Sequence, residues 1–179
     1  MFMYYTTHTA SPLGAIRLAS DGGNLVGLWN EGQKYFGASI KGDIMEKPDL
    51  PVFTAAKKWL DAYFAGKKPS ISELPLAPAG GAFRQTVWEI LREIPYGKCV
   101  TYGEIAQRTA ARMNRKSMSS QAVGGAVGHN PISIIIPCHR VIGANRSLTG
   151  YAGGIDKKMK LLAHEGVAPS CYVVPGVAR

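Results

Sequence analysis

The stretch TYGEIAQRTAARMNRKSMSSQAVGGAVG, residues 101–128, contains the clearest structural signals in the sequence. Thr101 followed by Glu104 is a capping box, in which the two side chains satisfy free backbone N–H groups at the start of a helix. The short helix that follows is expected to end at a basic connector, residues 111–118, and the small apolar segment 119–128 is expected to form a second helix. Helix, connector and helix in this order predict a helix-turn-helix.

Two adjacent glycines, Gly124 and Gly125, lie inside the second predicted helix. Each of them costs about 1 kcal/mol of helix stability relative to alanine, so a compensating contact is expected. Tight packing against a neighbouring helix is one explanation. The other is the close approach of a second backbone, such as a DNA strand, to a surface that lacks side chains. The basic connector and the helix-turn-helix pattern favour the second explanation.

A helix and a linker are predicted before this motif. Apolar residues recur at helical spacing over residues 83–94, and the turn sequence Pro-Tyr-Gly ends the pattern. Residues 69–82 contain several prolines and glycines and few periodic apolar residues, which is typical of a linker. We therefore expect a domain boundary there, with one domain over residues 1–79 and a second over residues 80–179.

The N-terminal part is predicted to be mixed α/β. Two strand-like runs, residues 15–19 and 25–29, are separated by the turn sequence Asp-Gly-Gly-Asn and predict a hairpin. Apolar residues then recur at helical spacing after Thr54, which is expected to cap a helix that ends before Gly66. The fold class is therefore α+β, with an α/β domain followed by a mostly helical domain.

The composition is that of a globular, basic protein. The chain has 179 residues, 46% of them apolar, which suits one or two domains with a real core. No apolar run reaches the roughly 18 residues of a membrane helix, and the start of the sequence lacks the features of a signal peptide, so a cytoplasmic protein is expected. A formal charge of +9 and a pI near 9.6 favour polyanionic partners, although a basic balance can also serve solubility alone.

Cysteine usage predicts free thiols and no metal site. The three cysteines, Cys99, Cys138 and Cys171, are odd in number and far apart, and no C-x-x-C pair suggests zinc or a redox motif.

Cys138 stands out because it lies within IIIPCHRVIG, residues 134–143, directly before His139. A thiol reacts as thiolate, and its reference pKa near 8.5 leaves little thiolate at neutral pH without help from a neighbouring group. Neighbours on an extended strand point to opposite faces, so His139 can reach the sulfur only where the chain turns, and Pro137 favours such a turn. Taken alone, the pattern also fits an inert core cysteine.

Further motifs accompany this cysteine. They are Tyr102 at a helix start, Asn130 before Pro131, Ile-Pro-Cys-His-Arg-Val at 136–141, Gly-Tyr-Ala-Gly-Gly at 150–154 and Leu-Leu-Ala-His-Glu-Gly at 161–166. Together they resemble the O6-alkylguanine-DNA alkyltransferases (methylated-DNA–protein-cysteine methyltransferases) of the stand-alone bacterial type. The resemblance implies a ribonuclease-H-like N-terminal α/β domain and a mostly helical C-terminal domain with a winged-helix-like helix-turn-helix.

This resemblance implies DNA repair by direct reversal. Cys138 would take the alkyl group from O6 of guanine in double-stranded DNA, and in some relatives from O4 of thymine, and the protein would be consumed in one turnover without a cofactor. It also implies that His139 accepts the thiol proton through a water and that Glu165 orients the imidazole. Glu165 follows a predicted helix that Asp156 is expected to cap, where a negative charge opposes the helix dipole, and an orienting role would explain its position.

Other family roles fall on residues around the pocket and on the helix-turn-helix. Tyr102 is implied to lie near an extruded base, and Asn130 is implied to brace the active-site turn. The implied pocket residues are Val141, Tyr151, Ala152 and Gly153. The implied minor-groove contacts are Ser119, Gln121, Ala122, Gly124 and Gly125, with Arg112, Arg115 and Lys116 at phosphates.

Two positions depart from the family pattern. Gln121 stands where many relatives carry an arginine that fills the space of the extruded base, so extrusion would be weaker, or shared with Arg112 or Arg115. Ala152 replaces a serine, but its backbone N–H could still bond O6. A monomer is expected.

Three other functions stay open at this level. An alkyltransferase-like protein binds lesions without repairing them, but such proteins have tryptophan at the position of Cys138. A regulatory DNA-binding protein would usually need a second methyl-accepting cysteine. A cysteine hydrolase would need a separate histidine and an oxyanion hole.

Overall fold

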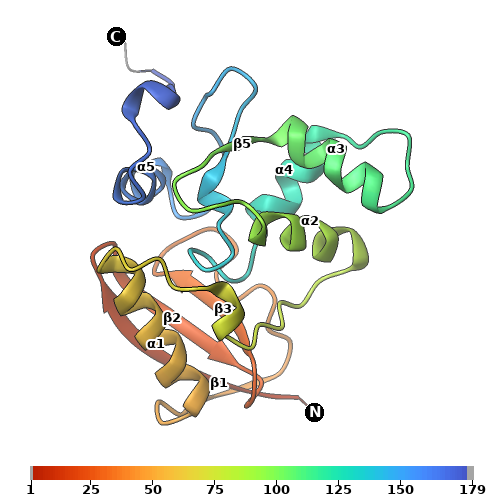
Figure 1. Ribbon diagram of the computed structural model, residues 1–179. Coiled ribbons are helices and arrows are strands. Elements are labelled where there is room, and N and C mark those ends of the chain that lie inside the picture. Colours follow the sequence, from red (N-terminus) through yellow and green to blue (C-terminus); the bar gives the residue numbers. More distant parts are fainter. Residues whose placement is uncertain (1, 177–179) are drawn as a thin grey trace. The chain divides into compact units, whose positions relative to one another are not determined.

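The computed structural model describes residues 2–176, which fold into two compact units (Figure 1). The first unit comprises the residues up to 80 together with residues 131–135, and the second comprises residues 81–130 and those from 136 onward. The segment 131–135 falls in the second domain of the sequence-based division, but it folds with the first unit. Leu28 N–H donates to Pro131 O at 2.8 Å, and Ser133 N–H donates to Leu28 O at 2.9 Å. Local sequence patterns do not report a pairing between such distant segments.

A four-stranded sheet forms the centre of the first unit. Its strands are β1 (Met3–Ser11), β2 (Gly14–Ser20), β3 (Leu25–Asn30) and β4 (Asp43–Glu46), in the spatial order β3-β2-β1-β4. β2 and β3 pair antiparallel, which confirms the predicted hairpin, and β4 pairs parallel with β1.

Helix α1 (Pro51–Phe64) packs on one face of this sheet and buries Phe53, Ala56 and Leu60. The prediction that Thr54 caps the helix is wrong. The helix begins at Pro51, with Leu50 at the N-cap position and no side-chain cap. Proline suits a first turn because its fixed φ is already helical and its missing N–H would have no partner there.

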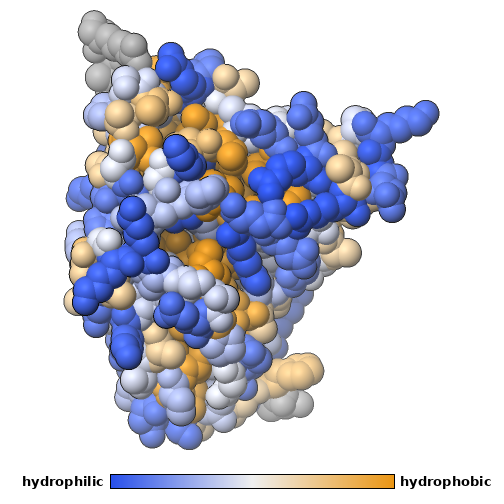
Figure 2. Space-filling model, viewed as in Figure 1, coloured by the Kyte–Doolittle hydropathy of each residue, from blue (hydrophilic) through white to orange (hydrophobic). Residues whose placement is uncertain are grey.

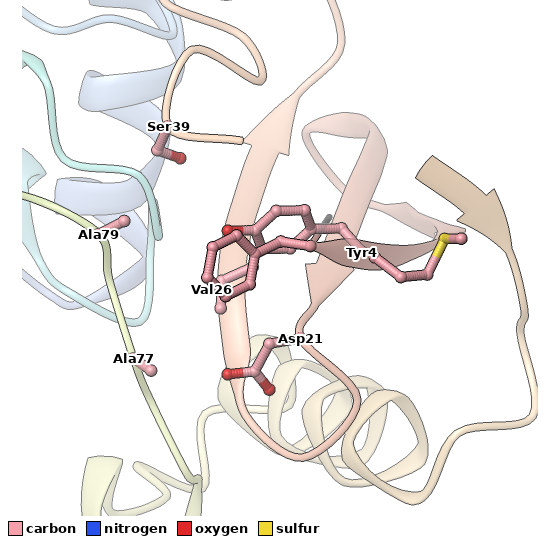
Figure 3. A pocket seen from close by; sticks show the side chains of 8 residues that line it. Tyr4, Asp21, Val26, Ser39, Ala77 and Ala79 are labelled. Carbon is pink, nitrogen blue, oxygen red and sulfur yellow. The ribbon is translucent and has the colours of Figure 1, made fainter. Parts of the chain in front are cut away.

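The opposite face of the sheet has a pocket of about 330 Å³ (Figure 3). Side chains alternate along β1, so Tyr4 points away from Thr7, whose hydroxyl accepts a hydrogen bond from Lys57 of α1 at 3.3 Å. The pocket is lined by Phe2, Met3, Tyr4, Asp21, Val26, Ser39, Ala77 and Ala79. None of the site residues predicted from the sequence lines it, so the candidate site lies elsewhere.

Helices α2 (Ala82–Arg92), α3 (Tyr102–Arg112) and α4 (Ser120–Gly128) pack against one another in the second unit. The buried indole of Trp88 ties α2 to α4, because its N–H donates to Ala126 O at 2.9 Å. The short strands β5 (Val100–Thr101) and β6 (Val141–Ile142) pair parallel, and α5 (Ile155–His164) follows. Single 3-10 turns occur at Ile71–Glu73, Cys138–Arg140 and Pro169–Cys171.

The predicted capping box opens α3. The Thr101 side chain accepts from Glu104 N–H at 3.2 Å, and the Glu104 carboxylate accepts from Thr101 N–H at 2.7 Å. α3 extends to Arg112, into the predicted connector, before the chain turns toward α4. The helix-turn-helix prediction is therefore confirmed, with a shorter connector than expected. Within residues 2–176, no helix combines the length and the apolar character needed to cross a lipid bilayer.

Candidate active site

Cys138 opens a single 3-10 turn, η2 (Cys138–Arg140), instead of lying on an extended strand. Arg140 N–H donates to Pro137 O at 3.0 Å and closes the turn. The turn predicted at Pro137 is therefore confirmed. It removes the strict alternation that would send the side chains of Cys138 and His139 to opposite faces.

The Cys138 thiol is buried, with 5% of the residue exposed. Burial raises its pKa, while a hydrogen bond from the Asn130 side chain and the charge of Lys158 act in the opposite direction. The Asn130 amide is itself held, because its Nδ2–H donates to Ile136 O at 2.7 Å. With its pKa raised, Cys138 is a neutral thiol in the resting protein and needs a base in order to react.

His139 has the properties of that base. It is fully buried, and its Nε2 lies 2.7 Å from Glu165 Oε1. Burial lowers the pKa of His139 more than the hydrogen bond and charge of Glu165 raise it, so the imidazole is neutral at pH 7. Since the carboxylate accepts from Nε2–H, the lone pair is on Nδ1, which has no hydrogen-bond partner among residues 2–176. A neutral imidazole with a free acceptor nitrogen is what general-base catalysis requires.

Arg140 keeps Glu165 ionised. Its Nε donates to Glu165 Oε2 and its Nη2 to Oε1, both at 2.9 Å, and Nη1 donates to Ile94 O at 2.6 Å. Burial alone would raise the pKa of Glu165, but the hydrogen bonds from His139 and Arg140 hold this pKa well below its usual range. Glu165 therefore orients His139 as a carboxylate at neutral pH.

Gly97 completes this cluster from a different part of the chain. Its N–H donates to Glu165 Oε2 at 3.0 Å, its φ is 73°, and a Cβ at this position would lie 2.8 Å from Glu165 O. Only glycine fits a left-handed backbone that approaches another backbone so closely. The sequence identified Gly97 only as the end of a helix and missed this contact.

Glu165 is the C-cap residue of α5, and Gly166 follows in a left-handed conformation with φ 78°. The prediction that Asp156 caps the start of this helix is wrong. Gly154, with φ 93°, occupies the N-cap position, and Asp156 lies in the first turn. A carboxylate in the first turn still interacts favourably with the helix dipole, so the residue type is appropriate although the position is not the cap.

Lys158 is a buried site residue that the sequence prediction missed. Its relative exposure is 0%, and its Nζ donates to Val141 O at 2.5 Å and to Thr149 O at 3.1 Å. It thus joins β6 to the following loop. Burial lowers the pKa of Lys158 to about 8, although the negative charges of the Cys138 and Cys99 thiolates would raise it. Its position three residues before Leu161, on the apolar stripe of α5, is the signal that could have identified it.

The free energy of unfolding is expected to depend on pH because of Lys158. The pKa of Lys158 in the folded protein is about 8, below the ordinary value of 10.5. Between these pH values the lysine is protonated in the unfolded chain and largely neutral in the folded protein. The folded state therefore becomes more stable as the pH rises from 8 to 10.5. Between pH 7 and pH 10, wild type is expected to gain roughly 2 to 3 kcal/mol relative to Lys158→Met. Urea unfolding at both pH values measures the difference. Lys160→Met, which changes an exposed lysine of the same helix, is the control and should show no such gain.

Tyr102 connects the helix-turn-helix to the loop after β6. Its hydroxyl donates to Thr149 O at 3.0 Å, and a Cβ at Gly150 would lie 3.3 Å from that hydroxyl. Burial, and next the negative charge of the Cys138 thiolate, raise the pKa of Tyr102 to about 12, so the phenol keeps its proton at neutral pH. A Cβ at Gly124 of α4 would lie 3.8 Å from the same ring. The Tyr102 side chain therefore contacts both α4 and the loop after β6. It also lies close enough to Cys138 for a thiolate charge there to raise its pKa.

The predicted pocket residues lie on β6 and on the loop that precedes α5. Val141 and Tyr151 are buried, whereas Ala152 and Gly153 are partly exposed. Lys158 donates hydrogen bonds to the carbonyls of Val141 and Thr149, so a buried charged amine holds β6 and this loop in place.

The outer surface of α4 is made mostly of small residues. Ser119 caps the helix by accepting from Ala122 N–H at 3.3 Å, and Gln121, Ala122 and Gly125 are exposed. A Cβ at Gly125 would meet nothing within 4 Å, and a Cβ at Gly124 would meet only Tyr102 at ordinary contact distance. Tight packing against a neighbouring helix therefore does not require glycine at these two positions.

Basic side chains lie on the connector that precedes α4. Arg115 and Lys116 are exposed on the connector and line a hollow of about 460 Å³ beside α3. On the face drawn in Figure 2, hydrophilic residues cover most of the end of α3 that leads into the connector. Arg112, in contrast, forms an ion pair with Glu93, as does Arg108, so its charge is already partly neutralised within the unit.

Net charge is also unevenly divided. Residues 1–80 and 131–135 contain 8 of the 21 Lys and Arg residues and 7 of the 12 Asp and Glu residues, so nearly all of the charge of +9 belongs to the second unit. Within the described part of the chain, no group of three or more His, Cys, Asp and Glu side chains could hold a metal ion.

Comparison with known proteins identifies the family. The family model described as "6-O-methylguanine DNA methyltransferase, ribonuclease-like domain" matches residues 3–78, and the one described as "6-O-methylguanine DNA methyltransferase, DNA binding domain" matches residues 82–167. A methylated-DNA–protein-cysteine methyltransferase of Haemophilus influenzae is 42% identical over 93% of this chain and 89% of its own length. One from Methanosarcina acetivorans is 47% identical over 92% of this chain and 99% of its own length.

Solved structures agree with these matches. The crystal structure of Mycobacterium tuberculosis OGT in complex with DNA is 39% identical, with a TM-score of 0.77 over 94% of this chain and 96% of that one. The ribonuclease-like and helical parts predicted from the sequence correspond to the two matched domains. The chain therefore belongs to the 6-O-methylguanine DNA methyltransferase family.

Proposed function

We propose that this protein repairs alkylated DNA by moving the alkyl group from O6 of guanine to Cys138 in a single turnover. One observation carries the proposal: a buried thiol, hydrogen-bonded by Asn130, directly precedes a buried His139–Glu165 pair in the unit that also contains the helix-turn-helix. The names of the relatives, which are methylated-DNA–protein-cysteine methyltransferases, describe the same chemistry.

The transfer is an in-line substitution at the alkyl carbon. The thiol proton moves toward Nδ1 of His139, the sulfur–carbon bond forms, and the carbon–oxygen bond breaks, with its electron pair returning to guanine. The guanine then takes up one proton, which balances the proton that His139 accepted from the thiol, and becomes the normal base. A thioether on Cys138 has no route back to a thiol here, so each protein molecule acts once.

Groups around the thiol have separate roles in this proposal. Asn130 positions the turn and stabilises developing thiolate, and Glu165 orients His139. Tyr102 turns its single O–H from the Thr149 carbonyl to the departing base, which its retained proton supports. Tyr151, Ala152 and Gly153 form the wall of the alkyl pocket. The Val141 carbonyl contacts the guanine, and Lys158 keeps that carbonyl in place.

The base must leave the helix to reach a buried thiol. In our proposal α4 enters the minor groove of double-stranded DNA with Ser119, Gln121, Ala122, Gly124 and Gly125, and the free space around Gly125 supports that approach. Arg115 and Lys116 contact phosphates, with a smaller contribution from Arg112, which gives affinity without sequence preference.

Gln121→Arg is expected to tighten binding to a duplex that contains O6-methylguanine by roughly five- to tenfold. A planar cation fills the position of an extruded base better than an amide does, and Gln121 is exposed on the outer surface of α4. Fluorescence anisotropy with Cys138→Ala as the background avoids alkyl transfer during the titration. An unchanged affinity would mean that another residue fills that position.

Lesion binding without repair is the second candidate, and the retained Cys138 beside its base counts against it. We also propose that the protein acts in the cytoplasm, because its three cysteines are free thiols, as is usual in a reducing compartment.

The deciding experiment is intact-protein mass spectrometry after incubation with a duplex that carries one O6-methylguanine. Repair predicts that each protein molecule gains the mass of one methylene group, with the modification on Cys138 and no further turnover. A protein that keeps its mass while the lesion persists is a binding protein, and one that releases product repeatedly is a hydrolase.

A further inference from the structure

The first unit has an apolar surface that the repair reaction does not use. Among residues 2–176, the large apolar side chains that are strongly exposed all belong to this unit, and four of them lie at the start of β1 and on β4. Their exposed fractions are 76% for Phe2, 40% for Met3, 56% for Ile44 and 50% for Met45. This unit is also nearly neutral, so it lacks the excess of positive charge that favours DNA, and an exposed apolar patch is typical of a protein interface.

The two edges of the sheet differ. The outer edge of β3 is covered, because Leu25 bridges to Leu76 and Leu28 bridges to Ile132. β4 is the other edge strand, and in the described part of the chain it pairs only with β1. An exposed edge strand with free backbone groups is a template for pairing with another chain.

The hydrogen bonds of β4 identify which of its backbone groups face outward. Asp43 N–H donates to Phe2 O at 3.1 Å, and Lys47 N–H donates to Thr6 O at 3.0 Å, so odd-numbered residues point their backbone groups toward β1. In a parallel pair, alternate residues direct their groups to opposite sides. The N–H and C=O groups of Ile44 and Glu46 therefore face the open edge.

We propose that two copies of this chain pair antiparallel through β4, which gives a two-fold symmetric dimer with one continuous eight-stranded sheet. The register is centred on Met45. Ile44 then exchanges both backbone hydrogen bonds with the partner's Glu46, and Met45 lies opposite the partner's Met45. In this arrangement all the outward-facing groups of β4 are satisfied, and the same patch serves both copies.

Charge complementarity selects this register. With Met45 at the centre, Asp43 lies opposite the partner's Lys47, and the symmetry repeats the pair. Opposite charges across neighbouring strands stabilise the pairing, whereas like charges destabilise it. A register centred on Ile44 would put Lys41 opposite the partner's Lys47, and one centred on Glu46 would put Asp43 opposite the partner's Asp49.

Short charged edge strands commonly prevent association. β4 differs because Asp43 and Lys47, which carry opposite charges, lie at equal distances from Met45 on either side of an apolar centre, which favours the proposed register. A strand of four residues buries little area, so we expect a weak dimer with a Kd on the order of 0.1 to 1 mM, and the monomer expected from the sequence predominates at lower concentrations. Each copy keeps its own Cys138, so the rate of alkyl transfer is unaffected.

Sedimentation equilibrium of the full chain from about 10 µM to about 1 mM tests the proposal. Asp43→Lys and Lys47→Asp each place like charges opposite one another and are expected to weaken the dimer about tenfold. The double variant restores opposite charges and is expected to return to the wild-type Kd. Lys67→Asp makes the same charge change at an exposed site after α1 and is the matched control.

Two further measurements make the test specific. Ile44→Pro removes only an outward-facing N–H and should abolish the dimer without loss of fold. In hydrogen exchange, the amides of Ile44 and Glu46 should become protected as the concentration rises. The proposal is overturned by a monomer at 1 mM, by Lys47→Asp and Lys67→Asp having equal effects, or by a double variant as weak as the single ones.

Discussion

Replacement of Cys138 by alanine is expected to abolish the methyl mass gain completely and to leave affinity for duplex DNA within about threefold of wild type. The sulfur is the only atom that forms a bond with the alkyl carbon, so nothing else in the site can substitute for it. The DNA contacts proposed for α4 and the connector do not involve this side chain. Intact-protein mass spectrometry and fluorescence anisotropy on the same preparation measure the two properties.

Cys99→Ala and Cys171→Ala are the controls, since they remove the other two free thiols. Burial raises the pKa of the Cys99 thiol, and Cys171 is exposed, so the two controls sample a partly buried and an exposed thiol. Both variants should gain the methyl mass at the wild-type rate. If Cys138→Ala still removes the methyl group from DNA, the nucleophile is another residue.

The second large effect is expected for Glu165→Gln. This change leaves Arg140 as a buried charge without its carboxylate and should lower the free energy of unfolding by about 3 to 5 kcal/mol. It also removes the group that raises the pKa of His139, so the imidazole becomes a weaker base and loses its orientation. The rate of methyl transfer at pH 7 should fall at least about 100-fold. Single-turnover kinetics and urea unfolding measure the two effects.

The stability effect of this variant has a defined pH dependence. The folded pKa of Glu165 lies below its ordinary value of 4.5, so the carboxylate stabilises the folded state above pH 4.5, and this contribution is lost as the pH falls toward the lowered pKa. The difference in unfolding free energy between wild type and Glu165→Gln should therefore be largest at neutral pH and smaller at about pH 3.

Glu93→Gln is the matched control for Glu165→Gln. Glu93 also pairs with two arginines, Arg108 and Arg112, but this cluster is exposed to solvent. An exposed pair contributes about 1 kcal/mol or less, and Glu93 has no contact with the imidazole. A Glu165→Gln protein as stable and as fast as Glu93→Gln would rule out the proposed role of the buried carboxylate. Glu165→Asp, which keeps the charge on a shorter side chain, should recover part of the rate.

Burial has two opposite consequences at this site. It raises the pKa of Cys138 and so keeps the resting thiol neutral, and it lowers the pKa of His139 and so keeps the base unprotonated. Both groups are therefore neutral before the reaction, and charge develops only when the thiol proton moves. In the proposed mechanism this protects the nucleophile until an alkylated base occupies the pocket.

Local interactions in both units could be predicted from the sequence. The Thr101–Glu104 capping box, the helix pair around the connector and the β2–β3 hairpin depend on residues a few positions apart, and the structure has each of them. The resemblance also identified the pairing of His139 with Glu165, which spacing alone does not reveal. The two mistaken caps, Thr54 and Asp156, show that a capping residue type near a helix start does not fix the first residue of the helix.

Only the tertiary structure revealed the contacts that support the site. Lys158 is a charged residue that local patterns assign to solvent, yet it is fully buried because two carbonyls from β6 and the following loop converge on it. Arg140 and Gly97 reach Glu165 from other parts of the chain, and residues 131–135 pair with β3 of the first unit. The sequence by itself predicted the helices and the turns, because these depend on neighbours along the chain, and the family resemblance supplied the proposed reactive residues. Burial, the pKa values that follow from it and the open edge of β4 depend on segments that meet only in the folded protein.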